Sequence, residues 1–232
     1  MLGVIVNVLA IAVGGTLGVL FKKVLSERIT QAMMMTLGLA TFVIGLQGAL
    51  KVEKHLLFVI SLALGTAIGT IIDIDKYVNM FGDFLKKIFM SKSKNESNEK
   101  FAEAFANASI LFAVGAMAVL GSINAGLKHD YNILFLKSTL DFVAAVMYAS
   151  IFGIGVAFSS ITILLFEGGI ALFSSLLSSL AENDAMMNEF SAVGNLLVMV
   201  IGLNLIGATK VKLANMLPSI VVVVILYRLV YV

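Results

Sequence analysis

The chain has 232 residues, of which 60% are hydrophobic and 13% are charged, and its formal net charge is +2. A soluble domain is about half apolar and about a quarter charged, so this composition offers too little polar surface to coat a soluble globule. The small net charge argues against nucleic-acid binding. Because there is no cysteine, disulfides, thiol nucleophiles and cysteine-ligated metal sites are excluded.

Apolar segments long enough to cross a bilayer follow one another along the whole chain. A spanning helix needs about 20 mostly apolar residues. Eight segments qualify: Leu2–Phe21, Ile29–Leu50, His55–Ile72, Phe105–Leu127, Ser138–Ser159, Ser160–Leu180, Phe190–Ala208 and Leu213–Tyr231. Almost no loop separates the fifth segment from the sixth, so one long broken helix plus a re-entrant piece, with seven spans in all, is the alternative. We expect an all-α, polytopic transmembrane helix bundle that forms a single domain over residues 1–232.

Basic residues indicate how the bundle is oriented. Lys22, Lys23 and Arg28 follow the first span, which argues against a cleaved signal peptide and favours an external N-terminus. With eight spans, 11 of the 16 Lys and Arg residues fall on the same inner side. We therefore expect both termini outside.

Residues 76–104 form the one long segment that is not a span. From Tyr77 to Phe89 apolar residues recur at helical spacing, which predicts an amphipathic helix lying on the inner leaflet. Ser91–Lys100 is polar and predicts a flexible linker. A solvated cytoplasmic loop is the alternative for the whole segment.

Two stretches that are 157 positions apart resemble each other. Leu39–Gln47 and Leu196–Asn204 share the sequence Val-Ile-Gly-Leu, followed by a carboxamide. The same offset aligns spans one to three with spans six to eight, and a difference of five spans makes the copies opposite in orientation. This is the inverted-repeat layout of many secondary transporters, with spans four and five as a hairpin between the copies. Chance similarity of apolar sequences is the alternative.

Charged residues inside the predicted spans are candidates for function. A charge at the bilayer centre costs about 3 kcal/mol on insertion scales. Lys137 and Asp141 are one turn apart on one helix face, and Glu167 precedes Gly168 and Gly169, where the helix could unwind and free carbonyls for an ion. The alternative is a buried Lys137–Asp141 pair that only locks helices, with Glu167 facing a partner helix or the interface.

Carboxamides in the spans are a weaker signal. Asn7, Gln47, Asn204 and Asn215 would usually act as hydrogen bonds between helices. Gln47 and Asn204 are the exception, because the repeat would bring both to a shared axis. Pro218 is a candidate helix break, and its alternative is a tolerated first-turn proline.

Several blocks resemble a known family. They are Lys137–Phe142, Phe190–Gly194, Asn215–Pro218, the early residues Gly3, Asn7, Gly14, Gly15 and Gly18, and Gly65–Gly69. On these blocks the chain resembles the YdfK/YqgA family of bacterial multi-pass membrane proteins, defined by domain of unknown function 554. The resemblance covers nearly the whole chain and implies a bacterial plasma (inner) membrane protein in which Lys137, Asp141, Asn7, Asn215 and Pro218 matter. It implies no substrate.

The leading functional hypothesis is a secondary transporter or channel for a small ion or solute, centred on the intramembrane polar residues. The alternative is a membrane scaffold or sensor subunit that transports nothing. No His-Glu-x-x-His, Gly-x-Ser-x-Gly or Walker sequence is present, so we expect no enzyme activity, no metal and no cofactor. The expected partners are the lipid bilayer, a small ion or solute, and further copies of the chain, since small-residue faces exceed what one bundle must bury.

Overall fold

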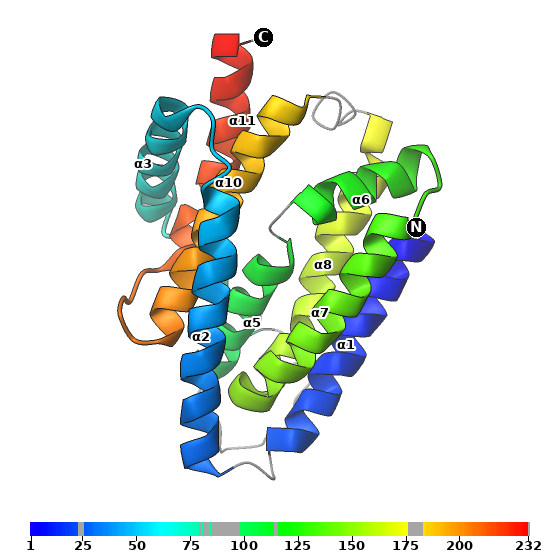
Figure 1. Ribbon diagram of the computed structural model, residues 1–232, viewed down its shortest axis with the longest axis vertical. Helices are drawn as coiled ribbons and strands as arrows, with labels where there is room; N and C mark the ends of the chain where they lie inside the picture. The colour runs from blue at the N-terminus through cyan, green and yellow to red at the C-terminus, as the bar shows by residue number, and fades with distance from the viewer. Residues whose placement is uncertain are drawn as a thin grey trace. The chain divides into compact units, whose positions relative to one another are not determined.

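The computed structural model describes residues 1–22, 26–78, 80, 84, 98–113, 116–175 and 183–231 (Figure 1). These residues are helical almost throughout, and they contain no strand. The elements are α1 (Leu2–Lys22), α2 (Glu27–Ala49), α3 (His55–Ile72), α5 (Asn98–Ala113), α6 (Ala116–Leu127), α7 (Asn132–Phe152), α8 (Gly155–Leu172), α10 (Asp184–Leu205), η1 (Leu213–Met216, a 3-10 turn) and α11 (Pro218–Tyr231). The expected all-α class is confirmed. Most of the expected amphipathic helix and linker lies outside the described residues and stays a prediction.

Seven stretches within the described residues are long and apolar enough to cross a membrane. An eighth candidate is a bent pair, Phe101–Ala113 and Met117–Leu127, whose two parts meet at 63°. The polytopic prediction is therefore confirmed. The alternative of one long broken helix in place of the fifth and sixth spans is wrong, because α7 and α8 are separate spans joined by a short connection at Gly153, whose φ of 89° ends α7.

The expected bounds of three spans are wrong by one or two turns. The fifth and sixth spans are Asn132–Phe152 and Gly155–Leu172, earlier than expected, because Lys137 is buried within α7 rather than placed before it. The seventh begins at Asp184, where the side chain of Asn183 caps the helix by accepting a 2.9 Å hydrogen bond from the backbone N–H of Met186.

The contacts divide the chain into two compact units. Unit 1 comprises Met1–Gln31, Lys76–Ala113 and Met117–Ser178, and unit 2 comprises Ala32–Asp75, Val114–Ala116 and Ser179–Val232. Each unit contains residues from both halves of the sequence.

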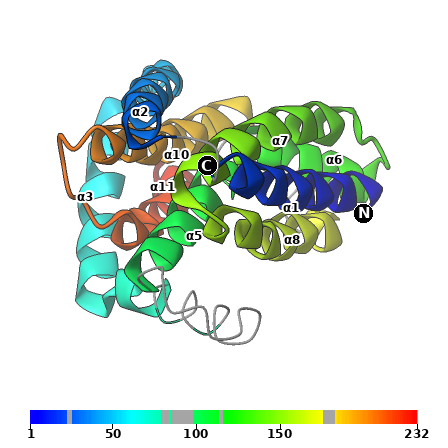
Figure 2. The same cartoon turned by 90° about the horizontal axis from the view of Figure 1, so that it is seen from below.

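In unit 1, α1 packs closely between α7 and α8 (Figure 2). A Cβ placed on Gly14 would lie 2.7 Å from the carbonyl oxygen of Phe142, and one on Gly18 would lie 2.3 Å from that of Val146. Only glycine permits backbones to approach so closely. Contacts that advance together along both helices show that α1 and α7 are parallel.

This parallel packing bears on the number of spans. Consecutive spans cross the membrane in alternating directions. Two spans that run parallel are therefore an even number of spans apart in the chain. Between α1 and α7 lie α2, α3 and the bent pair of α5 and α6, so one net crossing by the bent pair makes α7 the fifth span. The described residues thus contain seven candidate spans, or eight if the bent pair counts as one.

In unit 2, α3 packs on α11 and the adjoining η1 turn (Figure 1). A Cβ on Gly65 would lie 2.3 Å from Cα of Ser219, and one on Gly69 would lie 2.0 Å from the carbonyl oxygen of Asn215. From the first contact to the second, the residue number rises along α3 and falls along η1 and α11, so the two segments run antiparallel. These glycines pack helices within one unit, so they do not support contacts between copies of the chain. The homo-oligomer stays a prediction.

Candidate functional site

Helix α7 places an ion pair in the interior of unit 1. Lys137 and Asp141 are one turn apart, and Nζ of Lys137 contacts Oδ2 of Asp141. Their residues are only 5% and 8% exposed. The rest of α7 carries no charged side chain, so the sequence around the pair is apolar enough to bury it. A pair of this kind is stable in an apolar interior only when its geometry is good.

A second carboxylate reaches the same ammonium from another helix. Glu167 of α8 is fully buried, and its Oε1 lies 3.3 Å from Nζ of Lys137. Lys137 therefore lies between Asp141 on its own helix and Glu167 on α8. This links α7 to α8 through charge as well as packing.

Helix α1 completes the cluster with a carboxamide. Asn7 is fully buried, and its Nδ2 donates to both carboxylate oxygens of Glu167, at 3.0 and 3.2 Å. Its Oδ1 is buried without a hydrogen-bond partner. The Lys137–Asp141 pair thus forms one site with Asn7 and Glu167, which the sequence named separately from it, and we call this site the α1/α7/α8 cluster.

The cluster contains one ammonium and two carboxyl groups. If all three are ionised, their net charge is 1 − 2 = −1 inside an apolar bundle. Unbalanced charge in a low-dielectric interior is costly and is usually removed by pairing, protonation or a bound cation. Among the described residues no group of three or more His, Cys, Asp or Glu side chains could hold a metal ion.

Gly168 and Gly169 follow Glu167 but do not unwind the helix. Both lie inside α8, and the backbone N–H of Phe173 still donates to the carbonyl of Gly169 at 3.0 Å. The expected helix break at these residues is therefore wrong for this conformation, because regular α-helical hydrogen bonding continues through them. A Cβ on Gly169 would meet nothing within 4 Å, so packing does not require glycine there.

The other predicted site residues lie in unit 2 and make local contacts. Asn215 Oδ1 accepts a 2.8 Å hydrogen bond from the backbone N–H of Asp75. Asn204 donates to the carbonyl of Val211 at 2.9 Å and closes the turn after α10. Pro218 is the first residue of α11, a position where proline is tolerated, and it directly follows the η1 turn.

The expected pairing of Gln47 with Asn204 is not formed among the described residues. Gln47 is exposed on α2. The oxygen of Asn204 instead accepts from Thr209 Oγ1 at 2.6 Å and from the backbone N–H of Val211 at 3.1 Å. The carboxamide of Asn204 is hydrogen-bonded within the turn after α10, so it does not point toward α2.

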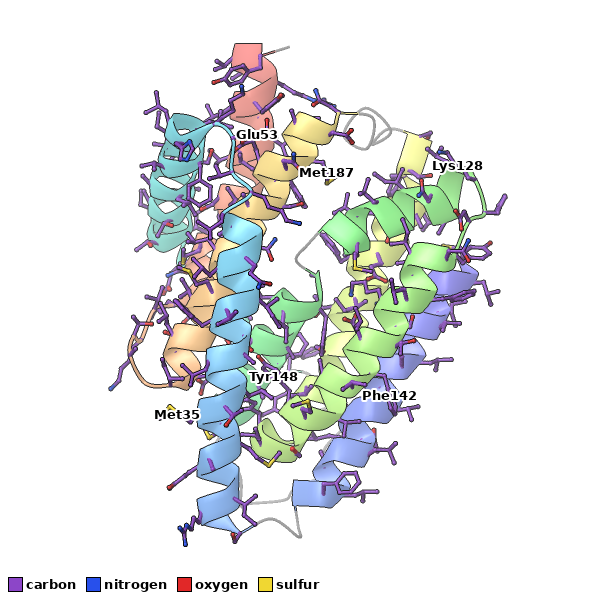
Figure 3. The ribbon with its side chains drawn as sticks, in the orientation of Figure 1. Met35, Glu53, Lys128, Phe142, Tyr148 and Met187 are labelled. Carbon is purple, nitrogen blue, oxygen red and sulfur yellow. The ribbon has the colours of Figure 1, made fainter. Side chains whose placement is uncertain are left out.

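Sequence reasoning missed a buried carboxylate in unit 2. Glu189 is fully buried on α10, and its Oε1 accepts from the backbone N–H groups of Glu53 and Lys54, at 2.9 and 2.6 Å. Figure 3 shows Glu53 beside the first turns of α10, where Met187 is labelled. These two residues directly precede α3, and a carboxylate at the N-terminal end of a helix interacts favourably with the helix dipole. The sequence signal was an acidic residue immediately before an apolar run.

An open apolar groove of about 760 Å³ runs along α3 in unit 2. Its lining residues are apolar or hydroxylated: Val59, Leu62, Ala63, Thr66, Ala67, Thr70 and Ile71. It contains no ionisable group, so it resembles a lipid-facing surface more than a site for an ion.

Comparison with known proteins identifies the family of the chain. A family model described as "Protein of unknown function (DUF554)" matches residues 2–228. The chain belongs to this family. It is 31% identical to "Uncharacterized membrane protein YdfK" of Bacillus subtilis (strain 168) over 233 residues, which covers 96% of this chain and 93% of that protein. It is 33% identical to "Uncharacterized protein YqgA" of Escherichia coli (strain K12) over 218 residues, with coverage of 94% and 92%.

Membership of the DUF554 family confirms the resemblance stated from the sequence. No solved structure is similar to the chain. The relatives support a membrane protein, and the function must be argued from the α1/α7/α8 cluster.

Proposed function

We propose that this DUF554 protein is a secondary transporter or channel for a small ion or solute, and not an enzyme. The observation that carries the proposal is the α1/α7/α8 cluster. Lys137, Asp141 and Glu167 are ionisable groups buried in helices that are otherwise apolar, and such groups usually mark ion or proton pathways in membrane proteins.

Reciprocal helix contacts support an inverted repeat with an offset of 157. A Cβ on Gly45 would lie 2.2 Å from the backbone nitrogen of Met199, and a Cβ on Gly202 would lie 2.4 Å from that of Phe42. Both 202 − 45 and 199 − 42 equal 157. The two contacts are thus the same contact seen from each repeat, which favours a two-fold relationship between α2 and α10.

The same offset recurs in the packing of α3 on α11. The hydroxyl of Ser219 donates to the carbonyl of Leu62 at 3.4 Å, and these residues are 157 positions apart. In unit 1, α1 and α8 are also antiparallel, as the contacts Asn7–Glu167 and Gly15–Ala157 show. Three sequence-equivalent helix pairs that each pack antiparallel are typical of inverted-repeat transporters.

We further propose that the protein lies in the inner membrane of a bacterium with both termini external. The excess of Lys and Arg in the segments assigned to the cytoplasm supports this orientation. Both relatives come from bacteria.

A non-transporting scaffold or sensor subunit is the second candidate. The observation that favours it is the direct contact of Lys137 with Asp141, because a closed ion pair can lock helices without binding anything else.

Electrical recording from reconstituted protein distinguishes a transporter or channel from a non-transporting scaffold. Proteoliposomes adsorbed on a solid-supported membrane are exposed to concentration jumps of protons, Na⁺, K⁺, chloride and a panel of small organic acids and amines. A transporter gives a current for at least one of them, and Glu167→Gln abolishes it. Currents no larger than those of empty liposomes for every solute would favour the scaffold.

The exposed carboxylate Glu103 of α5 provides a matched control. Glu103→Gln replaces a carboxyl group by a carboxamide, as Glu167→Gln does, but lies outside the cluster. It should therefore leave the current unchanged. Equal loss of current in both variants would show that the effect does not come from the cluster.

A further inference from the structure

We propose that the α1/α7/α8 cluster binds one exchangeable proton, held on Glu167 and hydrogen-bonded to Asn7. A consequence of this inference is that the proton is the coupling ion, and this consequence rests on the proposed function. The binding of the proton itself rests on the contacts and charges described below.

Charge balance requires one positive charge in addition to Lys137. Two buried carboxyl groups face one ammonium, and α7 and α8 contribute no other charged side chain. A single proton, or one monovalent cation, makes the cluster neutral. An apolar surrounding favours the neutral state strongly.

The helices packed against α7 and α8 carry few charged residues. Helix α1 adds only Lys22, its last residue, and α6 has no charged residue. Helix α5, which packs on α8 and α7, has Glu99 and Lys100 in its first turn and the exposed Glu103. Glu103 is exposed, and no ion pair or hydrogen bond of the described residues joins it to the cluster.

Glu167 is the group best placed to hold the proton. Asp141 shares a helix with Lys137, so their contact is maintained by one turn of α7. Glu167 lies on a different helix, 3.3 Å from Lys137, and its remaining partner is the neutral Asn7. Losing the ionic attraction to Lys137 therefore costs less at Glu167 than at Asp141.

A carboxamide can stabilise both forms of its carboxyl partner. In the present orientation Nδ2 of Asn7 donates to both oxygens of Glu167, as a charged carboxylate requires. A half-turn of the carboxamide brings Oδ1 to the same side, where it accepts the O–H of a protonated carboxyl. Oδ1 has no other partner to lose in this rotation.

The contacts favour a proton over a metal ion. Both oxygens of Glu167 already lie within hydrogen-bonding distance of Asn7, and Oε1 also lies near Lys137. A sodium ion would have to displace these N–H groups and find further oxygen ligands. A proton needs one acceptor, which Asn7 provides.

Infrared difference spectroscopy of the full-length protein in lipid nanodiscs measures the proton directly. At pH 7, where exposed carboxyl groups with ordinary pKa values near 4 are ionised, we expect the C=O band of one protonated carboxyl. The charge count predicts that Glu167→Gln removes this band. It also predicts that Asp141→Asn removes it, because Lys137 and Glu167 then form a neutral ionised pair.

Asn7→Leu tests the acceptor that the proposal assigns to Asn7. If protonated Glu167 donates to Asn7, loss of this acceptor shifts the frequency of the band. An unchanged frequency would overturn the inference. Glu103→Gln is the control and leaves the band intact.

Three further results would overturn the proposal. They are the absence of a protonated carboxyl in the wild-type protein at pH 7, a band that persists in folded Glu167→Gln, and a band that saturating Na⁺ removes at constant pH, which would indicate a sodium site. Circular dichroism establishes that each variant is folded, and the wild-type spectrum alone tests the charge count. A band without any transport current would sustain the proton site while contradicting the proposed function.

Discussion

The carboxamide nitrogen of Asn7 lies 3.0 and 3.2 Å from the two carboxylate oxygens of Glu167, although the residues are 160 positions apart. Through this contact α1 and α8 share a polar interaction in addition to their apolar packing. Lys137 approaches the same carboxyl group from α7, so three helices converge on the side chain of Glu167. Separation of α8 from α1 would break the hydrogen bonds of Asn7 with Glu167, and separation of α8 from α7 would break the contact of Lys137 with Glu167.

Lys137→Met should destabilise the protein strongly, because it leaves two carboxyl groups without their ammonium. Breaking a buried ion pair from one side costs about 3–5 kcal/mol. Adding Asp141→Leu to this variant removes one of the two unpaired carboxyl groups and should recover much of the lost free energy of unfolding. Thermal unfolding followed by circular dichroism measures both, with Met at the exposed Lys128 as the control. A Lys137→Met variant as stable as the control would show that the pair is not structurally important.

Gly15 and Gly169 provide a matched pair of alanine substitutions in unit 1. A Cβ on Gly15 would lie 2.6 Å from Cα of Ala157, so Gly15→Ala must push α8 away from α1. Overpacking of this kind costs about 1–3 kcal/mol. Gly169 has open space, so Gly169→Ala should be neutral or stabilise the helix by up to about 1 kcal/mol.

Gly169→Ala also tests whether α8 must bend during function. If the glycine at 169 serves flexibility, Gly169→Ala slows transport while raising or preserving the melting temperature. Unchanged currents in the stable Gly169→Ala variant would show that α8 works as a rigid helix.

Gly45→Ala and Gly202→Ala should be equally damaging. Each introduces a methyl group against the backbone of the opposite helix, at 2.2 Å from Met199 and 2.4 Å from Phe42. If α2 and α10 are equivalent parts of a repeat, the two losses of melting temperature agree closely. A large difference between them would argue against equivalent packing at these positions.

Glu189 should stabilise unit 2 through the backbone N–H groups of Glu53 and Lys54, which directly precede α3. Glu189→Ala leaves the backbone N–H groups of Glu53 and Lys54 without their acceptor, at a cost of about 1–2 kcal/mol. Glu189→Gln retains an acceptor oxygen and should cost less. Asp184→Ala, at an exposed acidic residue of the same helix, is the control. Equal melting temperatures for Glu189→Ala and the control would contradict this role.

The sequence predicted the helices well and the contacts between them poorly, for physical reasons. Apolar length alone identifies a spanning helix, and spacing along one helix identified the Lys137–Asp141 pair. The contact of Asn7 with Glu167 joins two helices whose relative register depends on glycine packing, such as Gly15 on Ala157, and no pattern within either helix contains it. Glu189 was overlooked because its partners are backbone N–H groups, which every residue possesses.

Single-cysteine labelling tests the proposed orientation, and the natural chain helps because it contains no cysteine. Lys128, in the turn after α6, and Lys210, in the turn after α10, are both exposed (Figure 3 labels Lys128). With eight spans and an external N-terminus, Lys128 faces outward and Lys210 faces the cytoplasm. Lys128→Cys should therefore react with a membrane-impermeant maleimide in intact cells, whereas Lys210→Cys should react only after permeabilisation. The reverse pattern would invert the orientation. The helices α7, α8 and α10 lie between the two turns, and three crossings place the turns on opposite sides of the membrane. Equal labelling of both in intact cells would place the turns on the same side, which requires an even number of crossings, so one of these helices would not span the membrane.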